Sequence, residues 1–387
     1  MNAIRTAVIG VGNMGSAHAS CIAAGRINGL TLSALCDVAP SRQAYCRERY
    51  PEVPCFASVE ELLAANVADA VIVAVPHPSH STVAIAALAN GLHVLVEKPV
   101  DAALSRAQAL CAAAEKSGKV FAVMLNQRTN PLFRRAREIV RSGLLGEIKR
   151  MVWIITNWYR TQHYYDSGAW RATWAGEGGG VLLNQAPHNL DLWQWIFGMP
   201  SAIYANCEYG KYHDIEVEDD VTAMAKYPNG ATGVFITTTG EYPGTNRLEI
   251  TGSKGKLVYE KGHLMYTKLD VDEREFTFST NQGFASIKNE TVELEIPQGH
   301  GEQHVGILKN FTNHLLYGEE LLAPGYEGIN GLSIANAMVL SAEKGKWVEL
   351  PNDGEEFWEL LQEKIKTSKN KEDAGVVFDT EGSYGNK

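Results

Sequence analysis

The first third of the chain repeats one hydrophobic pattern, in which a short apolar run rich in β-branched residues precedes an alanine-rich amphipathic stretch. The apolar runs predict strands at 5–10, 30–37, 68–75, 93–96 and 120–125. The amphipathic stretches predict helices at 15–24, 42–50, 59–65, 82–90 and 105–117. Because strands that alternate with helices form parallel sheets, the predicted fold class of this part is α/β, a doubly wound parallel sheet.

The pattern changes after residue 126. Amphipathic stretches predict helices at 131–142, 181–197, 304–317 and 329–344, and a short strand is expected at 347–350. From residue 221 apolar and polar residues alternate, with turn signals at 228–230 and 252–255 that indicate hairpins. We therefore expect an α+β domain with an open, mainly antiparallel sheet. The predicted boundaries are 1–125, 126–350, and 351–387 for a C-terminal helix and polar tail.

Composition and charge exclude several classes of protein. Hydrophobic residues make up 45% and charged residues 21% of the 387 residues, which is ordinary globular usage and excludes general disorder. The net charge of −10 repels phosphate backbones, so no nucleic-acid partner is expected. No apolar run approaches the ~20 residues that span a bilayer, and no leader cleavage site is visible, so the expected location is cytoplasmic without membrane contact. The six scattered cysteines form no CxxC pair and predict no metal site.

A glycine-rich segment lies where the first predicted strand becomes the first predicted helix. Its spacing is that of a dinucleotide-binding loop, with a tight turn, a close approach of backbone to pyrophosphate, and close helix packing. The helix N-terminus would then face the phosphates. The predicted cofactor contacts in this segment are Gly10, Gly12, Asn13, Met14 and Gly15.

An acidic residue ends the second predicted strand. Asp37 stands where a carboxylate binds the ribose 2′-hydroxyl, and it is followed by Val38 instead of an arginine. Because a carboxylate repels a 2′-phosphate, the predicted cofactor is NAD rather than NADP. Arg42 weakens this argument if its side chain reaches inward.

Two further segments make the sequence resemble a known family. They are Glu97-Lys98-Pro99, after the strand at 93–96, and Gly178-Gly179-Gly180, which runs into Asn184 and His188. Together with the glycine loop they resemble the glucose-fructose oxidoreductase, inositol dehydrogenase and rhizopine-catabolism family over about residues 4–350. The resemblance implies a Rossmann domain, a C-terminal α+β domain, and NAD(P)-dependent redox chemistry on sugars or cyclitols.

The resemblance also implies roles for single residues. Lys98 and His188 match the family's catalytic lysine and histidine, and Glu97 would lie near the nicotinamide ribose. Asn184 occupies a place that inositol dehydrogenase-like members fill with aspartate, which limits the inositol analogy. The segment that passes along the cofactor in the family corresponds to Val75, Pro76, His77 and His80, with His77 where asparagine is common.

Without the resemblance, the same residues allow two interpretations. On one helix Asn184, His188, Asp191 and Trp195 would form a single polar stripe and thus a site wall. The alternative is an ordinary core histidine and a charge on a helix face. Lys98 is equally ambiguous, because only its position at a strand end, where doubly wound sheets bind ligands, distinguishes it from a surface lysine.

Aromatic residues gather between 153 and 195, a segment that holds six of the eight tryptophans. Aromatic rings pack on the apolar faces of sugars while arginine, asparagine and tyrosine bind the hydroxyls, so the mixture favours a polyol pocket, although about half of these rings are expected in ordinary packing. Tyr159, Trp170 and Arg171 are the predicted substrate contacts, beside Asn184.

These observations lead to three hypotheses. The first is an NAD-dependent dehydrogenase of a sugar, glycoside or cyclitol secondary alcohol, with C3 of a glucoside as the favoured position, His188 as base and Lys98 as donor to the substrate oxygen. The second is redox-assisted glycoside cleavage with recycled NAD. The third is an NAD-binding regulator without turnover. A homodimer or homotetramer is expected, because the open sheet needs a cover.

Overall fold

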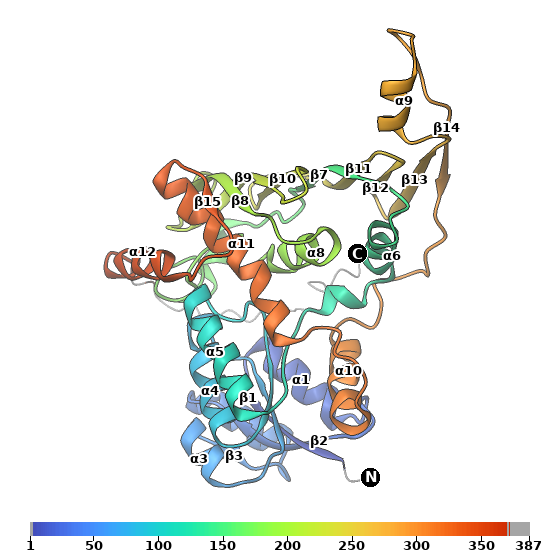
Figure 1. The fold of residues 1–387 in the computed structure, drawn as a ribbon. Helices are drawn as coiled ribbons and strands as arrows, with labels where there is room; N and C mark the ends of the chain where they lie inside the picture. Colours follow the sequence, from blue (N-terminus) through green and yellow to red (C-terminus); the bar gives the residue numbers. More distant parts are fainter. Residues whose placement is uncertain (1–2, 370, 372–387) are drawn as a thin grey trace.

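The computed structural model describes residues 3–369 and 371, and its N-terminal part is a six-stranded parallel sheet with helices on both faces (Figure 1). The strands are β1 (Ile4–Ile9), β2 (Leu30–Cys36), β3 (Cys55–Phe56), β4 (Ala70–Val73), β5 (His93–Val96) and β6 (Phe121–Val123). The helices are α1 (Asn13–Ala23), α2 (Pro40–Arg49), α3 (Val59–Ala64), α4 (His80–Ala89) and α5 (Leu104–Ser117). The predicted α/β fold class is confirmed.

The strand order β3-β2-β1-β4-β5-β6 decides where this sheet can bind a ligand. The chain leaves β1 toward one side and returns to β4 on the other, so the carboxyl ends of β1 and β4 border a crevice, the usual ligand site of such sheets. The glycine loop follows β1, the segment from Val75 follows β4, and Glu97 and Lys98 follow β5. The topology therefore brings three predicted site segments to one edge.

The C-terminal part contains a nine-stranded sheet of order β14-β13-β12-β11-β7-β10-β9-β8-β15. All its neighbouring pairs are antiparallel except β7 with β10. The hairpins predicted at 228–230 and 252–255 join β9 to β10 and β11 to β12. The strands are β7 (Ile148–Ile155), β8 (Ala202–Tyr209), β9 (Glu218–Lys226), β10 (Thr232–Thr238), β11 (Asn246–Gly252), β12 (Gly255–Glu260), β13 (His263–Leu269), β14 (Asn289–Glu293) and β15 (Val348–Glu349).

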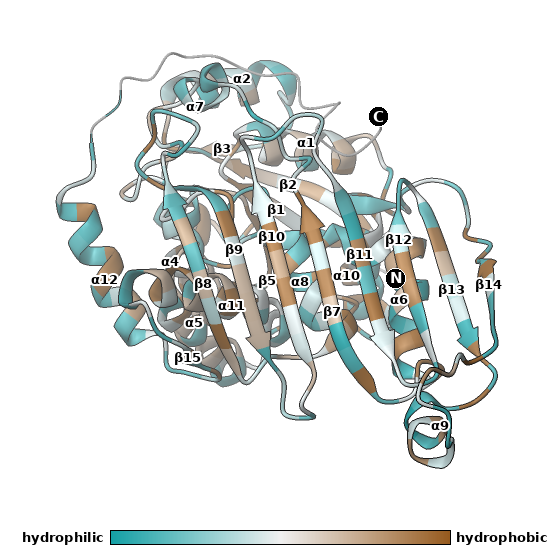
Figure 2. Cartoon of the chain, turned by 90° about the horizontal axis from the view of Figure 1, so that it is seen from above, coloured by the Kyte–Doolittle hydropathy of each residue, from teal (hydrophilic) through white to brown (hydrophobic). Residues whose placement is uncertain are grey.

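Helices cover one face of this sheet and leave the other open (Figures 1 and 2). The covering helices α6 (Pro131–Arg141), α8 (Pro187–Phe197) and α11 (Gly325–Lys344) lie between the sheet and the parallel domain. On the covered side Trp153 and Phe235 are fully buried, and Trp193 of α8 stacks on Phe235 with ring centroids 4.8 Å apart. The mainly antiparallel α+β domain is therefore confirmed, with one face available to solvent.

The remaining helices tie the two parts together. Helix α10 (Gln303–Tyr317) lies beside α1 of the parallel domain, where Gly29 leaves room for Leu316. Helix α12 (Glu355–Lys366) packs against α5 and α11, so a C-terminal helix is present as expected. The shorter helices are α7 (Gln162–Asp166), α9 (Glu273–Ser279), η1 (His77–Ser79) and η2 (Asn126–Thr129). The predicted polar tail at 372–387 lies outside the described residues.

One helix prediction is wrong in a way that matters for the site. The helix predicted over 181–197 begins only at Pro187, and residues 181–186 form turns. The cause is Pro187, which has no N–H and whose ring would clash with the carbonyl of Leu183 in a helix, so it fits only in the first turn of α8. Glu218 Oε1 accepts hydrogen bonds from the backbone N–H groups of Gly180 and Leu182, at 2.9 and 3.1 Å, and so holds the turns that precede the helix. Asn184 therefore does not share a helix with His188.

The helices of the described part include none that is both long and apolar enough to cross a bilayer. Within the same residues no group of three or more histidine, cysteine, aspartate or glutamate side chains could hold a metal ion. All six cysteines are free thiols.

Candidate active site

The glycine loop has the geometry that a dinucleotide needs. Gly10 has φ +85°, and a Cβ there would lie 2.6 Å from the carbonyl oxygen of Ala74. A Cβ at Gly15 would lie 1.8 Å from the carbonyl oxygen of Gly10, whereas at Gly12 nothing lies within 4 Å. Gly12 is thus open to a ligand at the N-terminus of α1, where anions bind in dinucleotide folds. Of the two predicted neighbours, Asn13 is exposed and Met14 is half-buried.

Asp37 lies next to this loop and is held by it. Its carboxylate accepts hydrogen bonds from the backbone N–H groups of Val11, at 2.7 Å, and Ala39, at 2.9 Å. Arg42 does reach inward, where its guanidinium donates to the carbonyl oxygen of Val11 and the hydroxyl of Ser16, both at 2.6 Å. The acid predicted to bind the ribose and the loop predicted to bind the phosphates therefore form one unit.

At the end of β5, Glu97 is buried and bonded to a partner that the sequence did not suggest. Its Oε1 lies 2.7 Å from Nε2 of His18 on α1, and its Oε2 accepts the backbone N–H of Lys98 at 3.1 Å. Burial by itself raises the pKa of the Glu97 carboxyl, but His18, His304 and Lys98 outweigh burial and lower it to about 2. Glu97 is therefore a carboxylate at neutral pH.

Lys98 points its amine at the turn before α8. Nζ donates to the backbone carbonyl of Asn184 at 2.9 Å. Burial lowers the pKa of Lys98 from its ordinary value, the carboxylates Glu97 and Glu177 oppose this shift, and Arg160 and Arg171 reinforce it. Two residues 86 positions apart in the sequence therefore lie in contact.

Glu177 is a site residue that the sequence analysis missed. Its carboxylate accepts a hydrogen bond from the Asn184 side-chain amide and a second from the backbone N–H of Ala172, the latter at 2.7 Å. Its side chain is buried, and burial raises its pKa. Glu177 stands between Gly176 and the three glycines at 178–180. This placement of an acidic residue within a glycine-rich turn could have identified it as a candidate site residue from the sequence.

His188 lies in the first turn of α8 with its Nδ1 buried and without a hydrogen-bond partner in the described part of the chain. Burial lowers its pKa well below the ordinary value, and the charges of Lys98 and His304 lower it further. His188 is therefore neutral at pH 7 and keeps a lone pair that can accept a proton. The sequence analysis did not predict that His304, on α10, lies close enough to His188 and Glu97 to affect their pKa values, because nothing in the sequence links residues so far apart.

The segment after β4 divides into two parts. Val75 and Pro76 lead into η1, and His77 has a buried Nδ1 that no described residue bonds and a ring edge-on to Trp170, with centroids 6.0 Å apart. His80 is different, because both its ring nitrogens lie 2.7 Å from backbone carbonyls, those of Pro99 and Val75. The His80 ring is thus buried and joins the segments that follow β4 and β5, so both its ring nitrogens are already engaged with the protein.

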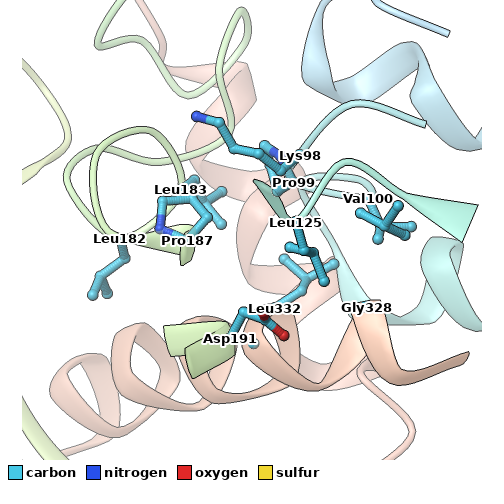
Figure 3. Close-up of a pocket in the computed structure, with 12 residues that line it drawn as sticks. Lys98, Pro99, Val100, Leu125, Leu182, Leu183, Pro187, Asp191, Gly328 and Leu332 are labelled. Atoms are coloured by element: carbon cyan, nitrogen blue, oxygen red, sulfur yellow. The ribbon is translucent and has the colours of Figure 1, made fainter. Parts of the chain in front are cut away.

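The polar stripe predicted from Asn184 to Trp195 does not form a wall of the site. The carboxylate of Asp191 forms two hydrogen bonds with the buried guanidinium of Arg128, at 2.9 and 2.7 Å. Figure 3 shows Asp191 and Lys98 at opposite ends of a small, mostly apolar pocket. Trp195 is buried, and Arg137 lies over its ring. Asp191 and Trp195 thus belong to the core, and only the N-terminal end of α8 reaches the site.

The aromatic segment contains both buried and exposed rings. Four of its tryptophans are buried, namely Trp153, Trp174, Trp193 and Trp195. Trp170 remains 37% exposed next to His77, and the guanidinium of Arg171 lies 4.5 Å from the Trp170 ring centroid. Tyr159 is 45% exposed and its ring packs on that of Tyr242, with centroids 5.6 Å apart.

A doubly wound sheet with a glycine loop open at the N-terminus of α1, and with a lysine and a histidine beyond its strand ends, defines a dinucleotide-dependent oxidoreductase. Two family sequence models match the chain, one described as an oxidoreductase family with an NAD-binding Rossmann fold over residues 4–125, the other as the GFO/IDH/MocA C-terminal domain over residues 133–258. Together they cover more than half of the chain, which therefore belongs to this family of NAD-dependent oxidoreductases.

Relatives align with nearly the whole chain. It is 24% identical to myo-inositol 2-dehydrogenase of Thermotoga maritima, covering 90% of this chain and 98% of the relative. It is also 24% identical to D-glucoside 3-dehydrogenase of Escherichia coli, covering 90% and 97%. Among solved structures, WlbA dehydrogenase of Bordetella pertussis in complex with NADH and UDP-GlcNAcA is 26% identical, with a TM-score of 0.76 and coverage of 91% and 100%.

Proposed function

We propose that the protein is an NAD-dependent dehydrogenase that oxidises a secondary alcohol of a sugar, glycoside or cyclitol, with C3 of a glucoside as the favoured position. The observation that carries the proposal is the meeting of Lys98, Asn184 and His188 at the strand ends that also hold the glycine loop. The names of the relatives support a hydroxylated ring as substrate, and the exposed Trp170 supports it independently.

NAD, when bound, accepts the hydride from the alcohol carbon. His188, neutral and with a free lone pair, takes the hydroxyl proton. Lys98, as an ammonium held by the carbonyl of Asn184, donates to the same oxygen and stabilises the negative charge that develops there. The Asn184 amide, fixed by Glu177, orients a hydroxyl but accepts no proton.

The experiment that tests this function is a substrate screen. Free sugars, inositols, and O- and C-glycosides are supplied with NAD or NADP, and reduced nicotinamide and released aglycone are measured in parallel. Reduced nicotinamide without aglycone is the expected result. Aglycone released without added NAD would favour redox-assisted cleavage, and unchanged absorbance with every compound would favour a regulator.

Cofactor preference should depend on Asp37. The Asp37→Asn variant removes the charge that repels a 2′-phosphate. Its one amide oxygen replaces only one of the two carboxylate oxygens that accept the N–H groups of Val11 and Ala39, so cofactor affinity is measured alongside. We expect the ratio of kcat/KM for NADP to that for NAD to rise at least ~10-fold, while Glu52→Gln, an exposed acid of the same domain, leaves it unchanged. Equal use of both cofactors by the unmodified protein would refute the preference.

Because the Glu177 carboxylate accepts a hydrogen bond from the Asn184 amide, an acidic residue at position 184 should be unfavourable. In Asn184→Asp two carboxylates would share one buried contact, so turnover should fall ~10-fold or more, and Glu177→Gln in the same protein should restore part of it. Asn184→Ala should instead raise KM more than it lowers kcat. Steady-state kinetics of the four proteins test this, and a fully active Asn184→Asp would contradict the contact.

We further propose that the protein is a homodimer or homotetramer built on the open sheet face. Met224 of β9 is 47% exposed on this face. It lies opposite Val234 of β10, which in turn lies opposite Val152 of β7. Ile236 and Ile154 form the next pair. These half-buried apolar side chains form a contiguous patch, which a second copy would cover.

Light scattering at micromolar concentration should therefore give a multiple of 42.3 kDa. Val234→Lys places a charge in the centre of the patch and should shift the mass toward one chain. The control is Leu144→Lys, since Leu144 is also apolar and 49% exposed but lies in a turn outside the sheet. A single-chain mass for the unmodified protein would refute the assembly.

A further inference from the structure

The guanidinium groups of two arginines lie close to the same aromatic ring beside the candidate active site. The guanidinium carbons of Arg160 and Arg171 lie 5.1 and 4.6 Å from the centroid of the Tyr164 ring. Arg171 also donates to the Tyr164 hydroxyl at 2.9 Å, and Gln185, next to Asn184, donates to the same oxygen at 3.3 Å. Arg171 is therefore linked through the Tyr164 hydroxyl to the turn that holds the Lys98 amine, and Arg160 lies against the same ring.

Neither arginine forms an ion pair with a carboxylate among residues 3–369 and 371. Nη1 of Arg160 donates to the carbonyl oxygens of Trp158 and Tyr159, at 3.3 and 2.9 Å, and Nη1 of Arg171 donates to the neutral phenol. A guanidinium has five N–H donors, so each side chain keeps most of its donors for another acceptor.

The surrounding charges leave this site positive. Arg160 and Arg171 add to burial in lowering the pKa of Lys98, which places all three cations in one electrostatic neighbourhood. Two carboxylates, Glu97 and Glu177, oppose these three cations, and Arg171 in turn lowers the pKa of Glu177, so an excess of one positive charge remains. Because like charges held together are unfavourable, an arrangement of this kind is stabilised by an anion.

We propose that the substrate is an anionic sugar, a uronic acid or its glycoside, whose carboxylate binds Arg171 and Arg160 while a ring hydroxyl faces Lys98 and His188. The flat fork of a guanidinium stacked on an aromatic ring matches a planar carboxylate. The reaction leaves that carboxylate unchanged, since the carbinol carbon loses a hydride to NAD, its oxygen loses a proton to His188, and a ketone forms. This inference rests on the proposed function and narrows its substrate class.

The test compares two glycosides that differ only at C6, methyl glucopyranoside and methyl glucopyranosiduronate, with glucose 6-phosphate as a second anion. We expect kcat/KM for the uronate to exceed that for the neutral glycoside by roughly 10- to 100-fold, the usual value of a charge-assisted hydrogen bond. Arg171→Gln should collapse this ratio, and Arg171→Lys should restore part of it. Arg49→Gln, an exposed arginine of α2, should leave the ratio unchanged.

Retained NADH binding shows that a variant is folded. A neutral glycoside oxidised as well as the uronate, a preference for the phosphate, or an unchanged ratio in Arg171→Gln would each overturn the anionic substrate while leaving the dehydrogenase in place. Failure of every neutral and acidic sugar to reduce NAD would overturn the proposed function itself.

Discussion

His188→Ala and Lys98→Met should each lower turnover by ~10²- to 10⁴-fold while NAD binding is kept. The first variant removes the neutral imidazole that takes the hydroxyl proton, and the second removes the donor that stabilises the developing charge on the substrate oxygen. The measurement is the rate of NAD reduction on the substrate found in the screen, with cofactor affinity measured separately.

Matched controls for these variants lie far from the strand ends. His263→Ala changes an exposed histidine of β13, and Lys116→Met changes an exposed lysine at the end of α5, so both should keep normal turnover. Near-normal rates in both His188→Ala and Lys98→Met would refute the catalytic assignment.

The pH profile carries further information on Lys98. Because burial lowers the pKa of Lys98, its ammonium loses the proton at a lower pH than an ordinary lysine, and turnover that needs this donor should fall with rising pH before the usual range is reached. In Lys98→Arg the side chain stays charged throughout, so whatever activity remains should lack this alkaline fall. An identical alkaline limb in both proteins would assign it to another group.

Asp191→Asn should destabilise the protein by about 1.5–3 kcal/mol, because the buried guanidinium of Arg128 loses a charge-assisted pair of hydrogen bonds while Glu327 remains as its counterion. Arg128 is fully buried and is bonded by Asp191 through two hydrogen bonds, with Glu327 and the carbonyl of Leu322 as its remaining partners. Urea unfolding followed by fluorescence measures the free energy of unfolding.

Two comparisons sharpen this prediction. Glu138→Gln breaks the exposed ion pair with Arg135 and should cost at most about 1 kcal/mol. The double variant Asp191→Leu with Arg128→Met removes both charges, and it should be less destabilised than Asp191→Asn. Equal stability of Asp191→Asn and the unmodified protein would show that Asp191 is not the main counterion of Arg128.

Local sequence signals predicted the parallel domain well because each element there depends on its own residues. An apolar run predicts a buried parallel strand, and three spaced glycines at a strand end predict a loop that only glycine fits, as the close approaches at Gly10 and Gly15 show. The hairpin turns of the second sheet were predicted for the same reason. The two-residue strand β3 was missed because it is too short to show a period.

Periodicity failed over 181–197 because it took no account of a proline. The apolar period is real, but Pro187 has no N–H and is tolerated only in the first turn of a helix, so α8 starts there and Asn184 lies in the preceding turns. Asp191 was interpreted as part of a site wall. In the structure its carboxylate is paired with the guanidinium of Arg128, 63 residues earlier, and a contact over that separation has no local sequence signal.

The sequence by itself determined the fold class and the cofactor loop, because spacing along one strand, loop or helix expresses these features. It named Lys98, Asn184 and His188 as candidates only through the family resemblance, since their spacing alone also allowed an ordinary core histidine and a surface lysine. Only the tertiary structure decided which side chains share the site. Glu177 fixes Asn184, His18 fixes Glu97, His80 serves as a link between strand ends, and Arg160 and Arg171 add charge near Lys98. Such contacts join residues from separate elements, and their energies depend on distance and burial, which no local pattern encodes.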